Sequence, residues 1–136
     1  MRPLIHRELT HEVIGSFFKV YNAFGYGFLE TPYVNALTIE LQNRGLRVQR
    51  ELPIELQYEG QKVGLYRADM IVEQKVLVEA KASAQMSEAD HRQIFNYLRA
   101  SKLAVGLLLH FGPTPNHKRV VWTGKAFETE IDPAVS

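Results

Sequence analysis

Three charged side chains interrupt two stretches of this sequence that otherwise resemble buried β-strands. Asp69 lies in "LYRADMIV", and Glu79 and Lys81 lie in "VLVEAKA". Alternate residues of a strand project from the same face, so Glu79 and Lys81 share a face. The short turn "EQK" joins the two stretches, which allows Asp69 to lie near Glu79 on the neighbouring strand.

Two carboxylates beside a lysine suit a site for Mg²⁺ or Mn²⁺, because hard divalent cations prefer oxygen ligands. Such an ion activates water and neutralises the charge that develops during phosphodiester hydrolysis. Lys81 would not bind the ion; it would orient the attacking water or face a phosphate. The E-x-K triplet is weak evidence by itself, since short motifs recur by chance. The apolar surroundings strengthen the evidence. A carboxylate and a lysine that form an ordinary surface ion pair would be expected on an exposed strand, whereas these charges interrupt a strand that is otherwise apolar.

Two further segments add candidate residues. Glu30 follows "GFL" at the expected start of a helix, where a carboxylate could also simply complement the helix dipole. Gln93 and Tyr97 in "QIFNY" are four residues apart and share a helix face. Their alternative interpretation is a half-buried aromatic ring beside an amide.

Composition predicts one globular domain in a chain of 136 residues, of which 46% are hydrophobic. Cysteine is absent, which excludes disulfides and thiolate metal sites and is compatible with a cytoplasmic protein. The longest apolar run, "AVGLLL", is too short to span a membrane, and "MRPLIHRELTHEV" does not resemble a secretory signal. We therefore expect a cytoplasmic location and no membrane partner.

The formal net charge is only +1, so any contact with nucleic acid must depend on a local basic cluster. Three clusters are candidates, although each is also compatible with ordinary surface charge. They are Arg44, Arg47 and Arg50; Arg92, Arg99 and Lys102; and His117, Lys118 and Arg119.

Hydrophobic periodicity predicts the secondary structure. A helix is expected over 10–24 with Thr10 as its N-cap, another over 31–44, and a third from Ser87 to about Lys102. Strands are expected over 46–58, 63–72, 76–82, 104–111 and 118–123, the first three as an antiparallel meander. The expected fold class is α/β, a mixed central sheet flanked by helices in the order ααβββαββ. Residues 9–123 would form the core of a single domain spanning 1–136, and 124–136 a polar tail.

The segment "GFLETPY" resembles the G-x-x-E-x-x-Y signature of the GxxExxY protein family, a branch of the PD-(D/E)xK nuclease superfamily. The resemblance extends over roughly 9–122 and includes "IELQNRGL", "YRADMIV", "VLVEAKA", "QIFNYL" and "GLLLHFG" in order. It implies a restriction-endonuclease-like core and a metal-dependent nuclease.

The resemblance also implies a role for each candidate residue. Asp69, Glu79 and Lys81 would be the catalytic motif, with Glu30 as a further catalytic carboxylate. The metal ligands would be Asp69, Glu79, Glu30 and the main-chain carbonyl of Ala80. Gln93 and Tyr97 would correspond to the Q-x-x-x-Y element of RecB-like nucleases and contact nucleic acid. The sequence departs from the pattern where Ala68 replaces the usual proline, which is not a ligand.

Three functional hypotheses follow. The first is a Mg²⁺- or Mn²⁺-dependent nuclease that hydrolyses phosphodiester bonds, with DNA as the expected partner. The second is a catalytically silent module of the same fold that binds nucleic acid or a protein. The third is a merely structural ion-pair network, which is disfavoured because such networks stabilise proteins poorly. A homodimer could present two sites to two strands; DNA versus RNA and exo- versus endonuclease stay open.

Overall fold

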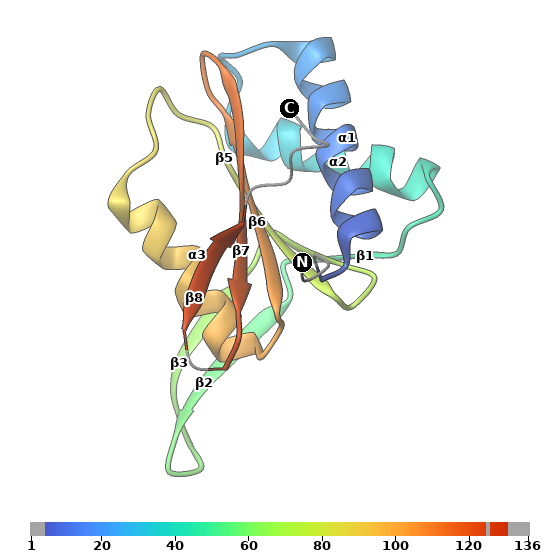
Figure 1. The fold of residues 1–136 in the computed structure, drawn as a ribbon. Helices are drawn as coiled ribbons and strands as arrows, with labels where there is room; N and C mark the ends of the chain where they lie inside the picture. Colours follow the sequence, from blue (N-terminus) through green and yellow to red (C-terminus); the bar gives the residue numbers. More distant parts are fainter. Residues whose placement is uncertain (1–4, 125, 131–136) are drawn as a thin grey trace.

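The computed structural model describes residues 5–124 and 126–130 (Figure 1). Its helices and strands follow one another in a mixed α/β order. They are α1 (Arg7–Phe24), α2 (Glu30–Asn43), β1 (Val48–Arg50), β2 (Pro53–Tyr58), β3 (Gln61–Arg67), β4 (Met70–Val72), β5 (Val76–Lys81), α3 (Glu88–Ser101), β6 (Val105–Phe111), β7 (Pro115–Trp122) and β8 (Phe127–Glu130).

Six strands form the central sheet in the order β1-β4-β5-β6-β7-β8. β5 and β6 run parallel, with α3 as the crossover between them, and the other neighbours are antiparallel. Figure 1 shows α1 and α2 on one face of the sheet and α3 on the other. The expected fold class, a mixed sheet flanked by helices, is confirmed and is consistent with a restriction-endonuclease-like fold.

The expected order ααβββαββ is wrong in detail, because two of the long strands are each broken in two. Residues 46–58 divide at Glu51, which has a positive φ of 51°, and at Pro53, which lacks an N–H for the sheet. Residues 63–72 divide at Ala68 and Asp69. As a result β1 pairs with β4 in the central sheet, whereas β2 and β3 form a separate hairpin. The expected three-stranded meander is therefore wrong.

Both ends of the expected core also need correction. Residues 127–130, expected to be polar tail, form β8 and extend the sheet beyond β7; residues 131–136 of that tail lie outside the described part. Thr10 is not the N-cap of α1, which begins at Arg7. Its hydroxyl lies within the helix, donates to the Arg7 carbonyl and accepts from buried Arg119 of β7. Arg119 is therefore not part of a basic surface cluster.

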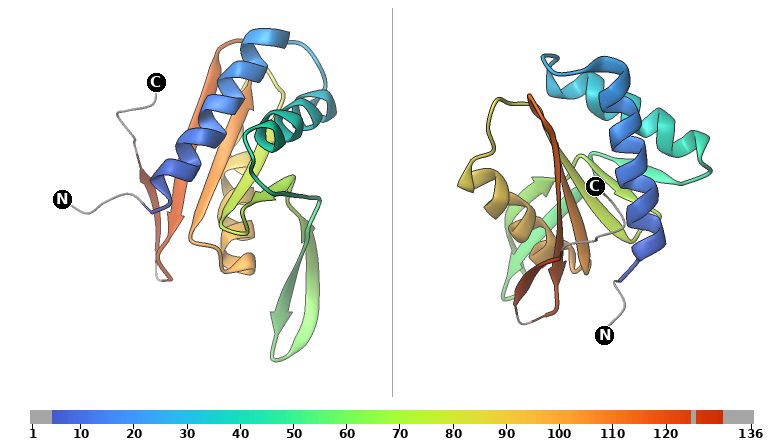
Figure 2. Two further views of the ribbon diagram at one scale, coloured as in Figure 1. Left: turned by 90° about the vertical axis from the view of Figure 1, so that its right-hand side faces the viewer. Right: turned by 45° about the horizontal axis from the view of Figure 1, so that its top comes forward.

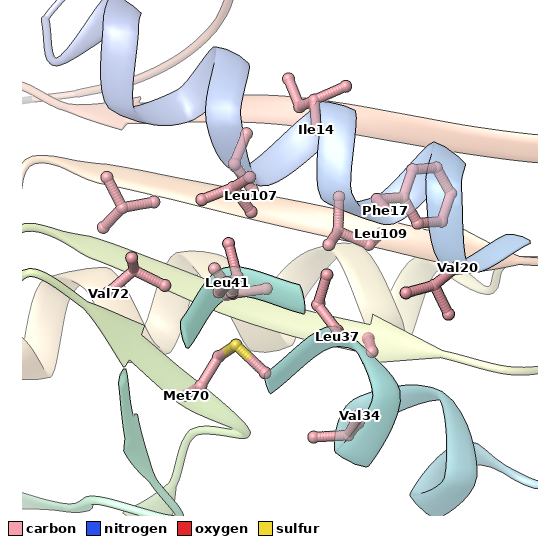
Figure 3. Close-up of a cluster of buried hydrophobic side chains, with 14 of the residues drawn as sticks. Ile14, Phe17, Val20, Val34, Leu37, Leu41, Met70, Val72, Leu107 and Leu109 are labelled. Carbon is pink, nitrogen blue, oxygen red and sulfur yellow. The ribbon is translucent and has the colours of Figure 1, made fainter. Parts of the chain in front are cut away.

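The main core fills the space between the sheet and the two N-terminal helices. Figure 3 shows side chains of α1 and α2 facing those of β4 and β6. Phe17, Leu37, Met70 and Leu107 are fully buried there. The amphipathic stripes of both helices thus meet one apolar sheet face, which fixes α2 against the strands.

A smaller core lies under α3, on the opposite sheet face. Ile94 and Leu98 of α3 pack there against Leu77 and Leu108. Gly106 of β6 lets the helix come close, since a Cβ at this position would lie 3.0 Å from the Ile94 Cδ1 atom. This packing sets the position of α3 relative to the end of β5.

Three connections gather at one end of the molecule in Figures 1 and 2: α1 to α2, β5 to α3, and β6 to β7. The β2–β3 hairpin projects at the opposite end. No helix in the described part of the chain has the length and apolar character needed to cross a bilayer.

The start of α3 supplies a first prediction. Ser87 and Asp90 form a capping box, in which each side chain accepts from the other residue's backbone N–H at 3.1 and 3.0 Å. Ser87→Ala should lower the free energy of unfolding by about 1 kcal/mol, because a helix N–H loses its acceptor. Urea denaturation would measure this. Ser87→Asn, which keeps an acceptor, is the matched control; equal loss in both variants would contradict the capping role.

Candidate active site

Asp69 and Glu79 are joined by two reciprocal hydrogen bonds. The Asp69 N–H donates to Glu79 Oε1 and the Ala80 N–H donates to Asp69 Oδ2, both at 2.8 Å. The antiparallel register of β4 and β5 pairs Met70 with Val78, which places Asp69 opposite Glu79. The expected proximity across the strand pair is therefore present, although Asp69 occupies the break before β4 and not the middle of a strand.

Lys81 shares the Glu79 face of β5 and lies at its end. Its Nζ atom is 4.0 Å from Glu79 Oε2 and 4.0 Å from Asp90 Oδ1. Glu79 is 3% exposed and the Lys81 side chain 19% exposed. The ammonium thus lies between a buried carboxylate and the more open surface at the start of α3.

Glu30 reaches the same site from the other side, as the first residue of α2. Its carboxyl group lies close enough to Asp69 for that charge to act on its pKa, and the charges of Lys81 and Asp90 also act on it. Tyr33, one helical turn later, holds the preceding loop: its hydroxyl donates to the Gly25 carbonyl at 2.5 Å and accepts from the Phe28 N–H at 3.2 Å. This anchoring fixes where the helix begins and therefore where Glu30 lies.

Burial raises the pKa values of all three carboxyl groups, and the charge of Asp69 raises those of Glu30 and Glu79 further. Burial, followed by the charge of Asp69, raises the pKa of Glu79 to about 8. The same two causes, in the same order, raise the pKa of Glu30 to about 7. The pKa of Asp69 is also raised, by burial, against the opposing effects of the Ala80 N–H and Lys81. Without a cation the fold therefore disfavours full ionisation of these carboxyl groups, and a bound cation would favour their ionised forms.

Gln93 and Tyr97 lie beside this cluster on α3. The Gln93 Nε2 atom donates to the Tyr97 hydroxyl at 2.8 Å, and the Tyr97 and Tyr66 rings are 5.4 Å apart. Burial and then the charge of Glu79 raise the pKa of Tyr97. These residues line an open pocket of about 440 Å³ that includes Lys81, Asp90, Arg92 and Asn96.

The structure thus brings every predicted site residue to one region: Glu30, Asp69, Glu79, Lys81, Gln93 and Tyr97. Oxygen donors are available for a hard cation, since Asp69 and Glu79 each use one carboxylate oxygen on a backbone N–H. Within the described residues, no three acidic, His or Cys side chains are already drawn together closely enough to enclose a metal. The donor set fits Mg²⁺ or Mn²⁺ in chemistry, and ligation by the Ala80 carbonyl stays a prediction.

Two residues near the site were not predicted as members. Asp90 belongs to the capping box of α3, and its Oδ1 atom also lies 4.0 Å from Lys81 Nζ. The charge of Arg50 acts to lower the pKa of Asp69, against the effect of burial. Its guanidinium donates to Asn35 Oδ1 at 3.0 Å and to Thr38 Oγ1 at 3.2 Å on α2. The signal for Arg50 was its place on the apolar face of a strand, where a lone charge needs a partner.

Among known proteins, the family model described as the PD-(D/E)XK nuclease superfamily matches residues 7–120. The searches of curated proteins and of solved structures gave no match. The matched segment contains α1 to β7 up to Val120 and so includes all the residues of the site.

The Tyr33 anchor generates a second prediction. Tyr33→Phe should destabilise the protein by about 1–3 kcal/mol, because the Gly25 carbonyl and the Phe28 N–H lose their partner. Chemical denaturation would measure the loss. Tyr58→Phe, on the exposed hairpin, is the control and should change stability by less than about 0.5 kcal/mol. Equal stability of Tyr33→Phe and the wild type would show that the hydroxyl does not hold the loop.

The raised pKa of Glu79 generates a third prediction, for the metal-free protein. Folding favours the protonated acid, so this contribution lowers stability as pH rises from about 4.5 to about 8. Glu79→Gln keeps an acceptor for the Asp69 N–H but removes the charge. It should raise Tm at pH 8.5 by about 3–5 °C, on the order of 1 kcal/mol, and leave Tm at pH 4.5 nearly unchanged.

Calorimetric scans in EDTA across this pH range would test it. The exposed Glu55→Gln is the control for a general charge effect. A Glu79→Gln variant less stable than the wild type at pH 8.5 would show that the Glu79 charge is stabilised in the fold.

Proposed function

Because the chain belongs to the PD-(D/E)XK nuclease superfamily, we propose that it is a Mg²⁺- or Mn²⁺-dependent nuclease that hydrolyses phosphodiester bonds of nucleic acid, with DNA as the substrate. The observation that supports this most strongly is the convergence of Glu30, Asp69, Glu79 and Lys81 from three separate elements. Each is a residue type that the chemistry requires.

The mutual repulsion of the carboxylates favours a functional role. The pKa values of Glu30 and Glu79, about 7 and about 8, mean that ionising these two carboxyl groups lowers the stability of the folded protein. A purely structural network would gain nothing from this arrangement. A bound divalent ion would reverse the effect, because it stabilises the ionised forms.

Asp69, Glu79 and Glu30 would hold the ion, with the Ala80 carbonyl as a further oxygen ligand. When bound, the ion supplies an activated water and neutralises charge on the phosphate. The backbone N–H groups of Asp69 and Ala80 orient the two carboxylates at 2.8 Å, so little reorganisation is needed.

Lys81 would face the scissile phosphate or orient the attacking water. Its ammonium lies 4.0 Å from Glu79 Oε2 and 4.0 Å from Asp90 Oδ1, and Lys81 and Asp90 both line the pocket. Gln93 and Tyr97 line the same pocket and would contact the nucleic acid. The hydrogen bond between them holds both side chains in place. The pocket would thus receive the substrate beside the carboxylates.

We further propose that the chain is a member of the GxxExxY type. Gly27 has a φ of 125°, which favours glycine, Glu30 carries the carboxylate, and Tyr33 holds the loop. The three positions of the signature thus have connected roles at one loop.

A second candidate is a catalytically silent module that binds nucleic acid or a protein. One observation favours it: the carboxylates of Asp69 and Glu79 are already hydrogen-bonded within the protein, and Glu79 lies near Lys81. Metal binding distinguishes the two candidates, because a silent module has no need of an ion at this cluster.

Substitution of Asp69 and Lys81 is the decisive test. Asp69→Asn keeps an acceptor for the Ala80 N–H but removes the charge, and Lys81→Met removes the ammonium. Each should lower the rate of Mg²⁺- or Mn²⁺-dependent cleavage of labelled DNA by at least about 10²-fold without loss of fold. Lys62→Met on the exposed hairpin is the matched control.

Calorimetric titration with Mg²⁺ and Mn²⁺ would accompany the cleavage assay. Binding by the wild type and loss of binding in Asp69→Asn are the expected results. Undiminished cleavage by both variants would refute the assigned site, and a wild type that neither binds metal nor cleaves would favour the silent module.

A further inference from the structure

The loop between α1 and α2 exposes an unusual concentration of large apolar side chains. Phe24 and Tyr26 are each 47% exposed, Phe28 is 52% exposed and Leu29 82% exposed. Exposed apolar residues normally occur singly on a protein surface, and a contiguous group indicates a binding surface. We call residues 24–29 the aromatic loop.

We propose that the aromatic loop is a stacking platform for unpaired bases, so that the site takes single-stranded nucleic acid or the frayed end of a duplex. This inference rests on the proposed nuclease function and names its substrate class.

Two rings of the aromatic loop and its backbone at Gly25 and Phe28 are anchored on Tyr33. The Phe24 and Phe28 rings meet edge to face at 5.8 Å, and both contact the buried Tyr33 ring. Tyr33 in turn stacks on Phe111 of β6 at 4.2 Å. The two hydrogen bonds of the Tyr33 hydroxyl fix the backbone on either side. Little conformational entropy would be lost on binding.

The aromatic loop is also continuous with the carboxylate cluster. Leu29 is the N-cap of α2 and Glu30 is its first residue. Tyr26 is four residues from Glu30, so their Cα atoms lie within about 15 Å of each other. Figures 1 and 2 show this loop at the end of the molecule where β5 leads into α3. A base stacked here would place its own or a nearby phosphate within reach of the cluster.

The charge of the protein favours stacking over a grip on phosphates. The net charge is +1, whereas duplex binding depends on many cationic contacts to the backbone. The arginines of the first candidate cluster are engaged elsewhere: Arg44 pairs with Glu12 and Glu40, and Arg47 with Glu73. Arg92 pairs with Glu88, and Arg99 lies over the Trp122 ring.

Stacking on aromatic side chains can add affinity to the few cationic contacts that this surface offers. It contributes about 1–3 kcal/mol per base and requires a base that is free of its duplex partner. Bases within an intact helix expose only their edges. The ligand that fits this loop is therefore an unpaired base.

The experiment measures binding of a fluorescein-labelled oligothymidylate of about 12 nucleotides. It uses the Asp69→Asn background, in which the proposed cleavage is blocked. Tyr26→Ala should weaken binding by about 5- to 150-fold, whereas Tyr26→Trp, which keeps an aromatic face, should retain it. Tyr58→Ala, which removes an exposed tyrosine of the distant hairpin, is the matched control and should bind normally.

An abasic oligonucleotide of the same length isolates the contribution of the bases. It should bind weakly, and equally, to the Asp69→Asn protein and to its Tyr26→Ala derivative. Equal affinity for normal and abasic strands, tighter binding of an intact duplex, or equal effects of Tyr26→Ala and Tyr58→Ala would each overturn the proposal. So would a wild-type dimer that Tyr26→Ala converts to a monomer in sedimentation, since a second copy would then cover the loop.

The outcomes separate this inference from the proposed function. If the wild type binds through base stacking but cleaves no substrate, the stacking proposal is supported and the proposed nuclease function is refuted. Cleavage that requires Asp69 but ignores Tyr26 in every substrate would support the nuclease and refute the platform.

Discussion

The site depends on the reciprocal hydrogen bonds between Asp69 and the Glu79–Ala80 segment. These bonds lie at the break between β3 and β4, one residue beyond the last backbone pair of β4 and β5, Met70 with Val78. They therefore hold the two strands together where their backbone pairing ends. The Asp69 N–H, free of the sheet at the break, is available for the Glu79 carboxylate. The break therefore creates the carboxylate pair.

The fold class and the membership of the site could be predicted from local patterns. The apolar period of "VLVEAKA" placed Glu79 and Lys81 on one face, and the short turn placed Asp69 beside them. The break at Ala68 could not be predicted, because residues 63–72 carry a continuous strand-like pattern and only tertiary pairing decides which sheet each half joins. Thr10 failed as a cap for a similar reason: its hydroxyl is engaged by Arg119, a residue distant in sequence.

Glu30 shows what sequence can and cannot give. The G-x-x-E-x-x-Y signature identified Glu30 as a candidate. Because Glu30 and Asp69 are far apart in the sequence, no local pattern predicted that the two carboxyl groups would lie close together. Contact requires that α2 dock on β4 and β5 through Leu37, Leu41 and Met70 and that Tyr33 anchor the preceding loop. Apolar packing in the core therefore sets the position of a carboxylate, and the same packing leaves Tyr26 and Leu29 outside the core.

The arrangement of β4, β5 and β6 also has a consequence for the order of folding. Only residues 73–75 separate β4 from β5, so the contact between Asp69 and Glu79 closes a very short loop and can form early. The parallel pairing of β5 with β6 must await the crossover through α3, and Glu30 must await α2. Asp69 and Glu79 are thus brought together by a short segment, whereas Glu30 joins them only through long-range packing. A partly folded chain would carry the motif without the site.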